Sequence, residues 1–193
     1  MARLAAAVIL ALSLAATSAV AESASEAVRA FGLVGTWSPD CAGAFRTIYA
    51  APAGAAPSVR VTMGGEEIAS SEIRETERLG PNRLKWSSVI KTWSLTDRPH
   101  ENWMPEPGEV WETVIEKSGD RIRPMLSQRQ DGQKISVKDG LIYNGAIAPD
   151  GHSVVWRNSG KATLPLARCS SDSAAAASPF AIASAAAPAT AKR

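Results

Sequence analysis

The stretch RLKWSSVIKTWSL, residues 83–95, alternates apolar and polar side chains. Leu84, Trp86 and Ile90 share one face of an extended strand, whereas the two lysines lie on the other face. One apolar and one polar face is typical of a strand in the wall of an antiparallel barrel or sandwich. The stretch therefore predicts a β-strand with one buried side.

Similar short segments, rich in Val, Ile, Thr, Trp and Tyr, lie on both sides of this strand and are separated by turn signals such as Gly64-Gly65, Asp131-Gly132 and Asp139-Gly140. Regular short strands with tight turns predict an all-β antiparallel meander, which tends to close into a barrel because closure removes the exposed edges. A sandwich is the alternative. The predicted strands are 33–38, 45–50, 58–63, 66–78, 83–95, 109–117, 121–129, 134–137, 141–143, 153–157 and 163–169.

Two details refine this prediction. In the segment 66–78, Ile68 and Ile73 fall on opposite faces, so a bulge is expected there. In the last strand, Leu164, Leu166 and Arg168 are expected to share the inward face. Because no long amphipathic helical pattern follows Phe31, a parallel α/β fold is not expected.

The chain is predicted to have four parts. Residues 1–21 carry one basic residue, an apolar run and a small-x-small end, which is the layout of a secretory signal peptide cleaved after Ala21. The alternative, a retained membrane anchor, is disfavoured because the apolar run is shorter than the ~20 residues that span a bilayer. Residues 22–31 form an arm or short helix, residues 32–169 the barrel domain, and residues 170–193 an Ala/Ser/Pro-rich disordered tail. The bacterial character of the composition indicates a periplasmic or secreted protein.

Charge and cysteine content exclude several classes of protein. The net charge is +2, or +1 after loss of Arg3, so no nucleic-acid partner is expected. The two cysteines, Cys41 and Cys169, are predicted to form a disulfide in an oxidising compartment. A catalytic thiol would need a histidine partner, and neither His100 nor His152 lies in a recognisable thiol-enzyme motif. The spacing of the two cysteines and the two histidines does not suit a zinc site. No metal and no cofactor is predicted.

The segment Leu33-Val34-Gly35-Thr36-Trp37 resembles the G-x-W opening of the lipocalin-like β-barrels. The resemblance implies that Trp37 closes one end of the barrel and that Arg168, on the last strand, packs across its indole ring. The longer pattern G-T-W-x-x-D-C, Gly35–Cys41, is similar to the opening of uncharacterised secreted proteins of proteobacteria, and this second resemblance implies no activity.

Candidate ligand-binding residues lie in and beside the segment TDRPHENWMPEPG, residues 96–108. Segments of this length without secondary structure in a compact domain are often functional. His100, Trp103 and Met104, together with Trp93, are expected to form a binding lip over the barrel mouth; the alternative is that Trp103 caps the core. The other tryptophans, Trp37, Trp86, Trp111 and Trp156, are expected to be core residues.

Two functions are compatible with these features. The first is a secreted binding module that holds a small apolar or amphipathic molecule in the barrel. The second is a protein-interaction barrel, such as a periplasmic inhibitor of a protease or lysozyme, which would act through the arm 22–31 or the segment with Trp103; a structural envelope protein is a third possibility. Because no nucleophile motif accompanies His100-Glu101, the protein is not expected to be an enzyme.

Overall fold

The computed structural model describes residues 23–94, 105–147 and 154–170, and of Ala146, Ile147, Val154 and Trp156 only the backbone. In this part of the chain, no helix combines the length and apolarity needed to cross a membrane. The described elements are α1 (Ala24–Ala30), β1 (Gly35–Ser38), β2 (Phe45–Ala50), β3 (Ser58–Met63), β4 (Glu66–Arg78), β5 (Arg83–Trp93), β6 (Val110–Ser118), β7 (Arg121–Arg129), β8 (Ile135–Lys138), β9 (Leu141–Ile147), β10 (Val154–Ala162) and β11 (Leu166–Arg168).

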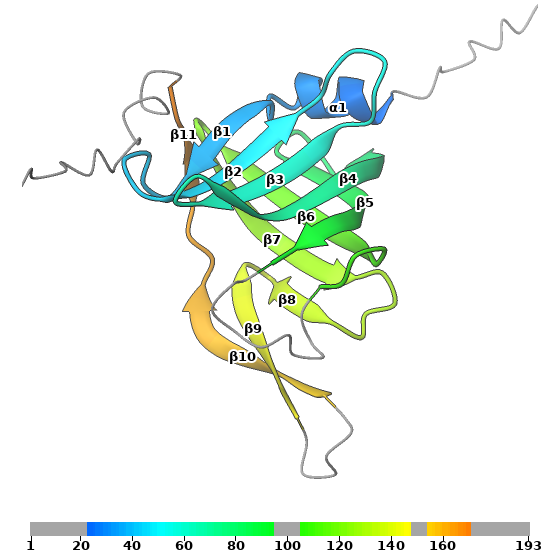
Figure 1. Ribbon diagram of the computed structural model, residues 1–193, viewed down its shortest axis with the longest axis vertical. Helices are drawn as coiled ribbons and strands as arrows, with labels where there is room; N and C mark the ends of the chain where they lie inside the picture. Colours follow the sequence, from blue (N-terminus) through cyan, green and yellow to red (C-terminus); the bar gives the residue numbers. More distant parts are fainter. Residues whose placement is uncertain (1–22, 95–104, 148–153, 171–193) are drawn as a thin grey trace, which may run out of the picture.

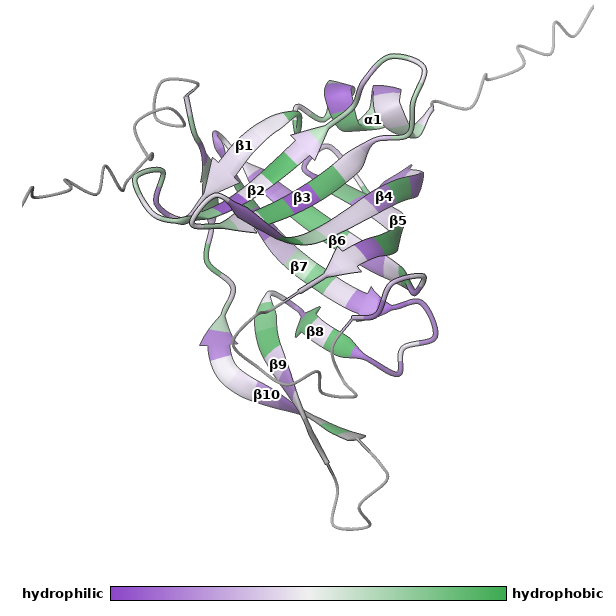
Figure 2. Ribbon diagram, viewed as in Figure 1, coloured by the Kyte–Doolittle hydropathy of each residue, from purple (hydrophilic) through white to green (hydrophobic). Residues whose placement is uncertain are grey.

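The sheet closes on itself as an eight-stranded antiparallel barrel (Figure 1). Strands β1 to β7 pair in chain order, and β11 lies between β7 and β1 to complete the ring. The predicted antiparallel barrel is confirmed. Alternation of apolar and polar residues along the barrel strands is visible as changing colour bands in Figure 2, as expected for walls with one buried face.

Strands β8, β9 and β10 branch from the barrel instead of closing it. The first half of β7 pairs with β11 through Ile122, whereas its second half pairs with β8 through Leu126 and Ser127 on the same edge. Strands β9 and β10 form a long hairpin that projects away from the barrel, on the side opposite α1 (Figure 1).

The predicted irregularity in β4 is present as two register shifts. Opposite β3, Ile68 is the additional residue between Glu67 and Ala69, and opposite β5, Arg74 is the additional residue between Ile73 and Glu75. Each extra residue reverses the alternation that follows it. Ile73 is therefore buried, at 1% exposure, while Ile68 is only partly buried.

One end of the barrel is closed by α1 and the residues that follow it. Ser23 caps the helix and forms a capping box with Glu26, and Val28 and Phe31 pack into the core. The helix ends in a Schellman arrangement, with Gly32 at a φ of 76° and the Leu33 amide bonded to the Val28 carbonyl at 3.1 Å. The first strand was predicted to begin at residue 33. Because the helix ends in this arrangement, the strand begins at Gly35 instead.

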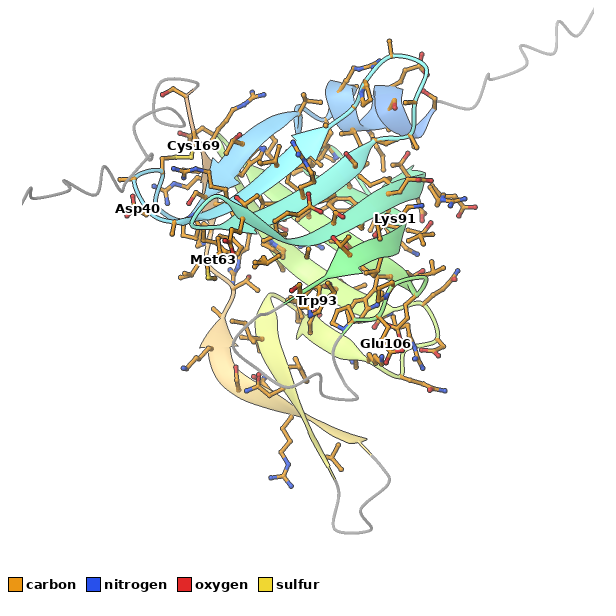
Figure 3. The ribbon with its side chains drawn as sticks, viewed as in Figure 1. Asp40, Met63, Lys91, Trp93, Glu106 and Cys169 are labelled. Carbon is orange, nitrogen blue, oxygen red and sulfur yellow. A yellow bond between two sulfur atoms is a disulfide. The ribbon has the colours of Figure 1, made fainter. Side chains whose placement is uncertain are left out.

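The barrel is closed by a short seam and a disulfide. The pairing of β1 with β11 consists of Trp37 with Arg168 and Ser38 with Ala167. The expected disulfide joins Cys41 to Cys169 just beyond this pairing, across a sequence separation of 128 residues. Cys169 and the nearby Asp40 are labelled at this edge of the barrel in Figure 3.

The last strand is shorter than predicted, and the inward placement of Leu164 is wrong. Leu164 is 64% exposed, whereas Leu166 is buried. The reason is Thr163, whose hydroxyl donates to the carbonyls of Pro124 and Gly140 and whose amide bonds to Gly140. These bonds hold the segment before Leu166 outside the β-ladder, so alternation does not apply to it.

Candidate ligand-binding cavity

The barrel is filled with side chains in the half near α1 and hollow in the other half. A cavity of about 330 Å³ occupies the hollow half. Its floor includes Tyr49 and Trp86, whose rings meet edge to face with centroids 6.0 Å apart. Both residues also belong to the packed core cluster, so this aromatic pair separates the core from the cavity.

The wall of the cavity is apolar and aromatic, interrupted by hydroxyl groups. Apolar members come from β3, β5, β6 and β8, including Val59, Val61, Ile90, Trp111 and Val137. Among the described residues that line the cavity, none carries a formal charge. Small-molecule sites typically combine an apolar wall with a few placed polar groups, and range from about 300 to 1,000 Å³.

Trp93 reaches the cavity because of a bulge in β5. Counting in twos from Trp86 places Trp93 on the outer face, but Lys91 is an additional residue between the pairs Ser71–Ile90 and Ser70–Thr92. This bulge brings Trp93 opposite Ala69, and both line the cavity. The label of Trp93 in Figure 3 lies on the side of the barrel near β8, away from α1.

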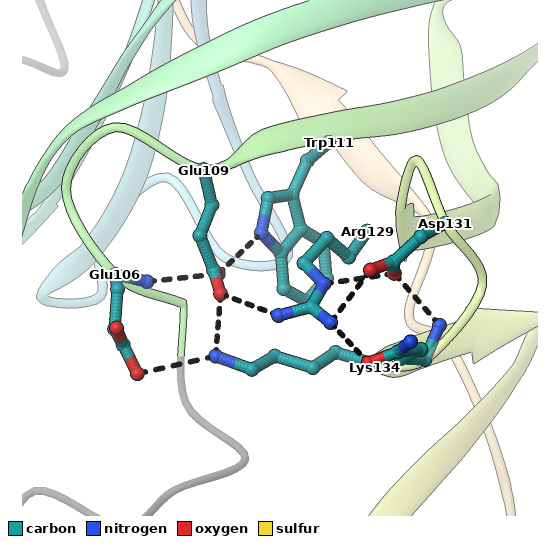
Figure 4. Close-up of polar contacts among 7 residues, drawn as sticks. Glu106, Glu109, Trp111, Arg129, Asp131 and Lys134 are labelled. Carbon is teal, nitrogen blue, oxygen red and sulfur yellow. Dashed lines mark hydrogen bonds and ion pairs between the residues drawn. The ribbon is translucent and has the colours of Figure 1, made fainter.

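A cluster of charged residues borders this end of the barrel, next to Trp111 (Figure 4). Glu109 accepts hydrogen bonds from the Trp111 indole at 3.1 Å and from the Glu106 amide at 3.0 Å. Its other oxygen lies 2.6 Å from Lys134 Nζ and 3.0 Å from Arg129 Nη1. The side chains of Glu109 and Lys134 are largely buried, at 13% and 9% exposure.

These contacts set the protonation of the cluster. Burial acts to raise the pKa of Glu109, but the hydrogen bonds from Lys134, Trp111, the Glu106 amide and Arg129 outweigh it and lower the pKa to about 2. The hydrogen bonds of Arg129 with Asp131 and Glu109 raise the pKa of its guanidinium. Glu109 and Arg129 are therefore both ionised near neutral pH.

The charged cluster joins three segments of the chain. Glu106 and Glu109 precede β6, Arg129 ends β7, and Asp131 and Lys134 lie in the turn before β8. Arg129 is the cross-strand partner of Trp111, but its guanidinium is engaged by Glu109 and Asp131. The cluster consequently fixes the indole of Trp111 beside the cavity, and both of its cations are paired with carboxylates.

The predicted site residues fall in three places. Trp93 lines the cavity; His100, Trp103 and Met104 lie outside the described residues. Trp37 and Arg168 lie at the β1–β11 seam, where the guanidinium carbon is 5.6 Å from the indole centroid.

Trp86 and Trp111 were predicted from the sequence to be core residues. They are buried, at 3% and 4% exposure, and they also line the cavity. Two hydroxyl residues that line the cavity, Thr47 and Ser88, were not predicted, because an isolated Ser or Thr in a strand gives no indication of the face to which it points.

The described residues contain no group of three or more His, Cys, Asp or Glu side chains arranged to hold a metal ion. Comparisons of the chain with protein-family models, with curated proteins and with solved structures found no match.

Proposed function

We propose that the protein is a secreted, periplasmic binding protein that holds a small apolar or amphipathic molecule inside its barrel, and that it acts by binding and not by catalysis. The observation that carries this proposal is the cavity of about 330 Å³ in one half of the barrel. The interior of an eight-stranded barrel is just wide enough for side chains to fill or for one small ligand. Because native cores leave few voids larger than a water molecule, a hollow of this size is unlike ordinary packing.

Two features support the periplasmic location. Disulfides persist in oxidising compartments, and Cys41–Cys169 reinforces the barrel seam. The N-cap residue Ser23 lies two positions beyond Ala21, so cleavage after Ala21 leaves the capping box of α1 intact. The mass of the exported protein measures this cleavage directly.

The inhibitor alternative gains no support from the arm 22–31. Val28 and Phe31 are buried in the core, at 0% and 3% exposure, and Arg29 donates to the Ala51 carbonyl at 2.6 Å. A segment held in this way is suited to closing the barrel and not to entering the site of a partner protein.

The test is binding of the neutral fluorescent probe N-phenyl-1-naphthylamine to the disulfide-bonded protein. Ser71 and Thr113 line the cavity from β4 and β6, so Ser71→Phe and Thr113→Phe each reduce its volume. Ser87→Phe is the matched control, since Ser87 is paired with Glu112 on the outer face of β5. We expect saturable probe binding by the wild-type protein and the control, and at least tenfold weaker binding by both cavity variants.

Absence of probe binding by the folded wild-type protein, or equal binding by all four proteins, would refute the proposal. If the wild-type protein does not bind the probe and Ser71→Phe has a higher melting temperature than the wild type, the hollow is a packing defect.

A further inference from the structure

The polar groups of the cavity define the chemistry of its ligand. Thr47 and Tyr49 on β2 and Ser88 on β5 line the cavity, and their side chains are buried, at 7%, 4% and 3% exposure. Within the described chain their hydroxyls form no hydrogen bond, although the oxygens remain open to the cavity. Buried hydroxyls normally form hydrogen bonds with protein groups or bound molecules, so these three can bond to a ligand in the cavity.

Trp93 adds a donor to this set. Its indole Nε1 is buried and has no hydrogen-bond partner among the described residues, although the ring lines the cavity. An indole N–H can only donate a hydrogen bond, whereas a hydroxyl can donate or accept one. The ligand that satisfies all these groups must therefore present acceptor oxygens or nitrogens.

A charged ligand does not suit the same site. The described lining contains no Lys, Arg, Asp or Glu, and the charged residues at the rim are paired with one another. Burying an ionised group without a counter-charge is costly, while a neutral carbonyl needs only a hydrogen bond.

We propose that the cavity is selective for small neutral molecules that carry a hydrogen-bond acceptor such as a ketone or ester carbonyl, with the acceptor bound by the hydroxyls of Tyr49 and Ser88. Thr47 and the Trp93 indole offer donors to a second acceptor of the same ligand. This inference rests on the proposed function and names its ligand class. Tyr49 fits the role because burial raises the pKa of its phenol, so the group keeps its proton and remains a donor.

The experiment compares three probes of similar size in displacement of N-phenyl-1-naphthylamine at neutral pH: acetophenone, ethylbenzene and benzoate. The first is neutral with a carbonyl acceptor, the second is neutral without one, and the third is an anion. We expect acetophenone to bind at least tenfold more tightly than benzoate, because only benzoate must lose its hydration without a counter-charge.

Single-atom variants then test the hydrogen bonds. Tyr49→Phe and Ser88→Ala each remove one hydroxyl and are expected to weaken acetophenone binding by about threefold to tenfold while leaving ethylbenzene binding unchanged. Ser87→Ala is the matched control, because Ser87 neighbours Ser88 but pairs with Glu112 on the outer face. Unchanged melting temperatures show that the variants are folded.

The outcomes separate the two proposals. If the fluorescent probe does not bind the folded wild-type protein, the proposed function falls. If the probe binds but benzoate binds within tenfold of acetophenone, or if the hydroxyl variants weaken acetophenone and ethylbenzene equally, the binding function stands and the selectivity for neutral acceptors is wrong.

Discussion

Arg168 lies over the indole ring of Trp37, with its guanidinium carbon 5.6 Å from the ring centroid, and donates a hydrogen bond to the Val34 carbonyl. The two residues are cross-strand partners on β11 and β1, so the contact spans the seam that closes the barrel. The pairing of these two strands is short. The side-chain contact therefore reinforces closure where the backbone ladder is weakest.

Replacement of Arg168 by Met is expected to lower the free energy of unfolding by about 1–2 kcal/mol, through loss of the cation–π contact and one hydrogen bond. Urea unfolding monitored by circular dichroism measures this difference. Arg157→Met is the control, since Arg157 is exposed on the projecting strand β10. Equal stability of the two variants would show that the contact contributes nothing to closure.

The disulfide is expected to be the largest single contribution to stability. Cross-linking residues separated by 128 positions removes enough unfolded-state entropy to stabilise the chain by about 4–5 kcal/mol, and measured values are often lower. The double variant Cys41→Ser with Cys169→Ser should unfold at a much lower urea concentration than the oxidised wild type. Dithiothreitol should destabilise the wild type and leave the double variant unchanged; a wild type indifferent to reduction would contradict the prediction.

Glu109 makes stability depend on pH in the acid range. Its folded-state pKa, about 2, lies below the ordinary value of 4.5, so the unfolded chain binds the proton more readily. The stabilisation by ionised Glu109 is complete above pH ~4.5 and is lost as the pH falls through about 2. Glu109→Gln should reduce the free energy of unfolding at pH 7 by about 1–3 kcal/mol and reduce the pH dependence between pH 4.5 and 2.

A suitable control for Glu109→Gln is Glu116→Gln. Glu116 pairs with Arg83 at 2.6 Å, but the side chains are 36% and 51% exposed. Exposed pairs contribute little, so this variant should lose less than about 1 kcal/mol. Comparable losses of unfolding free energy for the two variants at pH 7 would show that the Glu109 cluster stabilises the fold no more than an exposed ion pair does.

Val28 tests whether α1 is a part of the core. It is fully buried beneath the helix, so Val28→Ala should cost about 1–3 kcal/mol of unfolding free energy. Ala30→Ser, on the exposed side of α1, should change stability much less. The measurement is thermal or urea unfolding of the disulfide-bonded protein. A negligible effect of Val28→Ala would show that α1 adds little to the core, and the arm 22–31 would then be available to bind a partner protein.

The barrel wall was largely predictable because its signals are local. Strands β2, β3, β4 and β7 have the predicted bounds, since a two-residue alternation bounded by Gly-containing turns specifies both the strand and its inward face. The phase conflict between Ile68 and Ile73 also indicated a bulge in β4. The failure at Leu164 has a different origin, because its position depends on side-chain bonds from Thr163 to residues that are distant in sequence.

The candidate site was less predictable. Trp93 was expected to contribute to a binding lip, but the bulge at Lys91 that turns it inward has no counterpart in the alternation of β5. The cluster around Glu109 combines residues from β7, the segment before β6 and the turn before β8, and no sequence spacing relates them. Hydroxyls such as Ser88 become meaningful only when the cavity beside them is known.

The sequence by itself determined the antiparallel strands, the inward positions of Trp37, Trp86 and Trp111, and the single possible intramolecular pairing of its two cysteines, because each follows from local alternation or from simple count. Only the tertiary structure decided which half of the barrel is filled. That choice depends on where α1 docks and on the bulge in β5 that turns Trp93 toward the cavity. These are long-range packing relationships, and they create the hollow half in which we place the ligand.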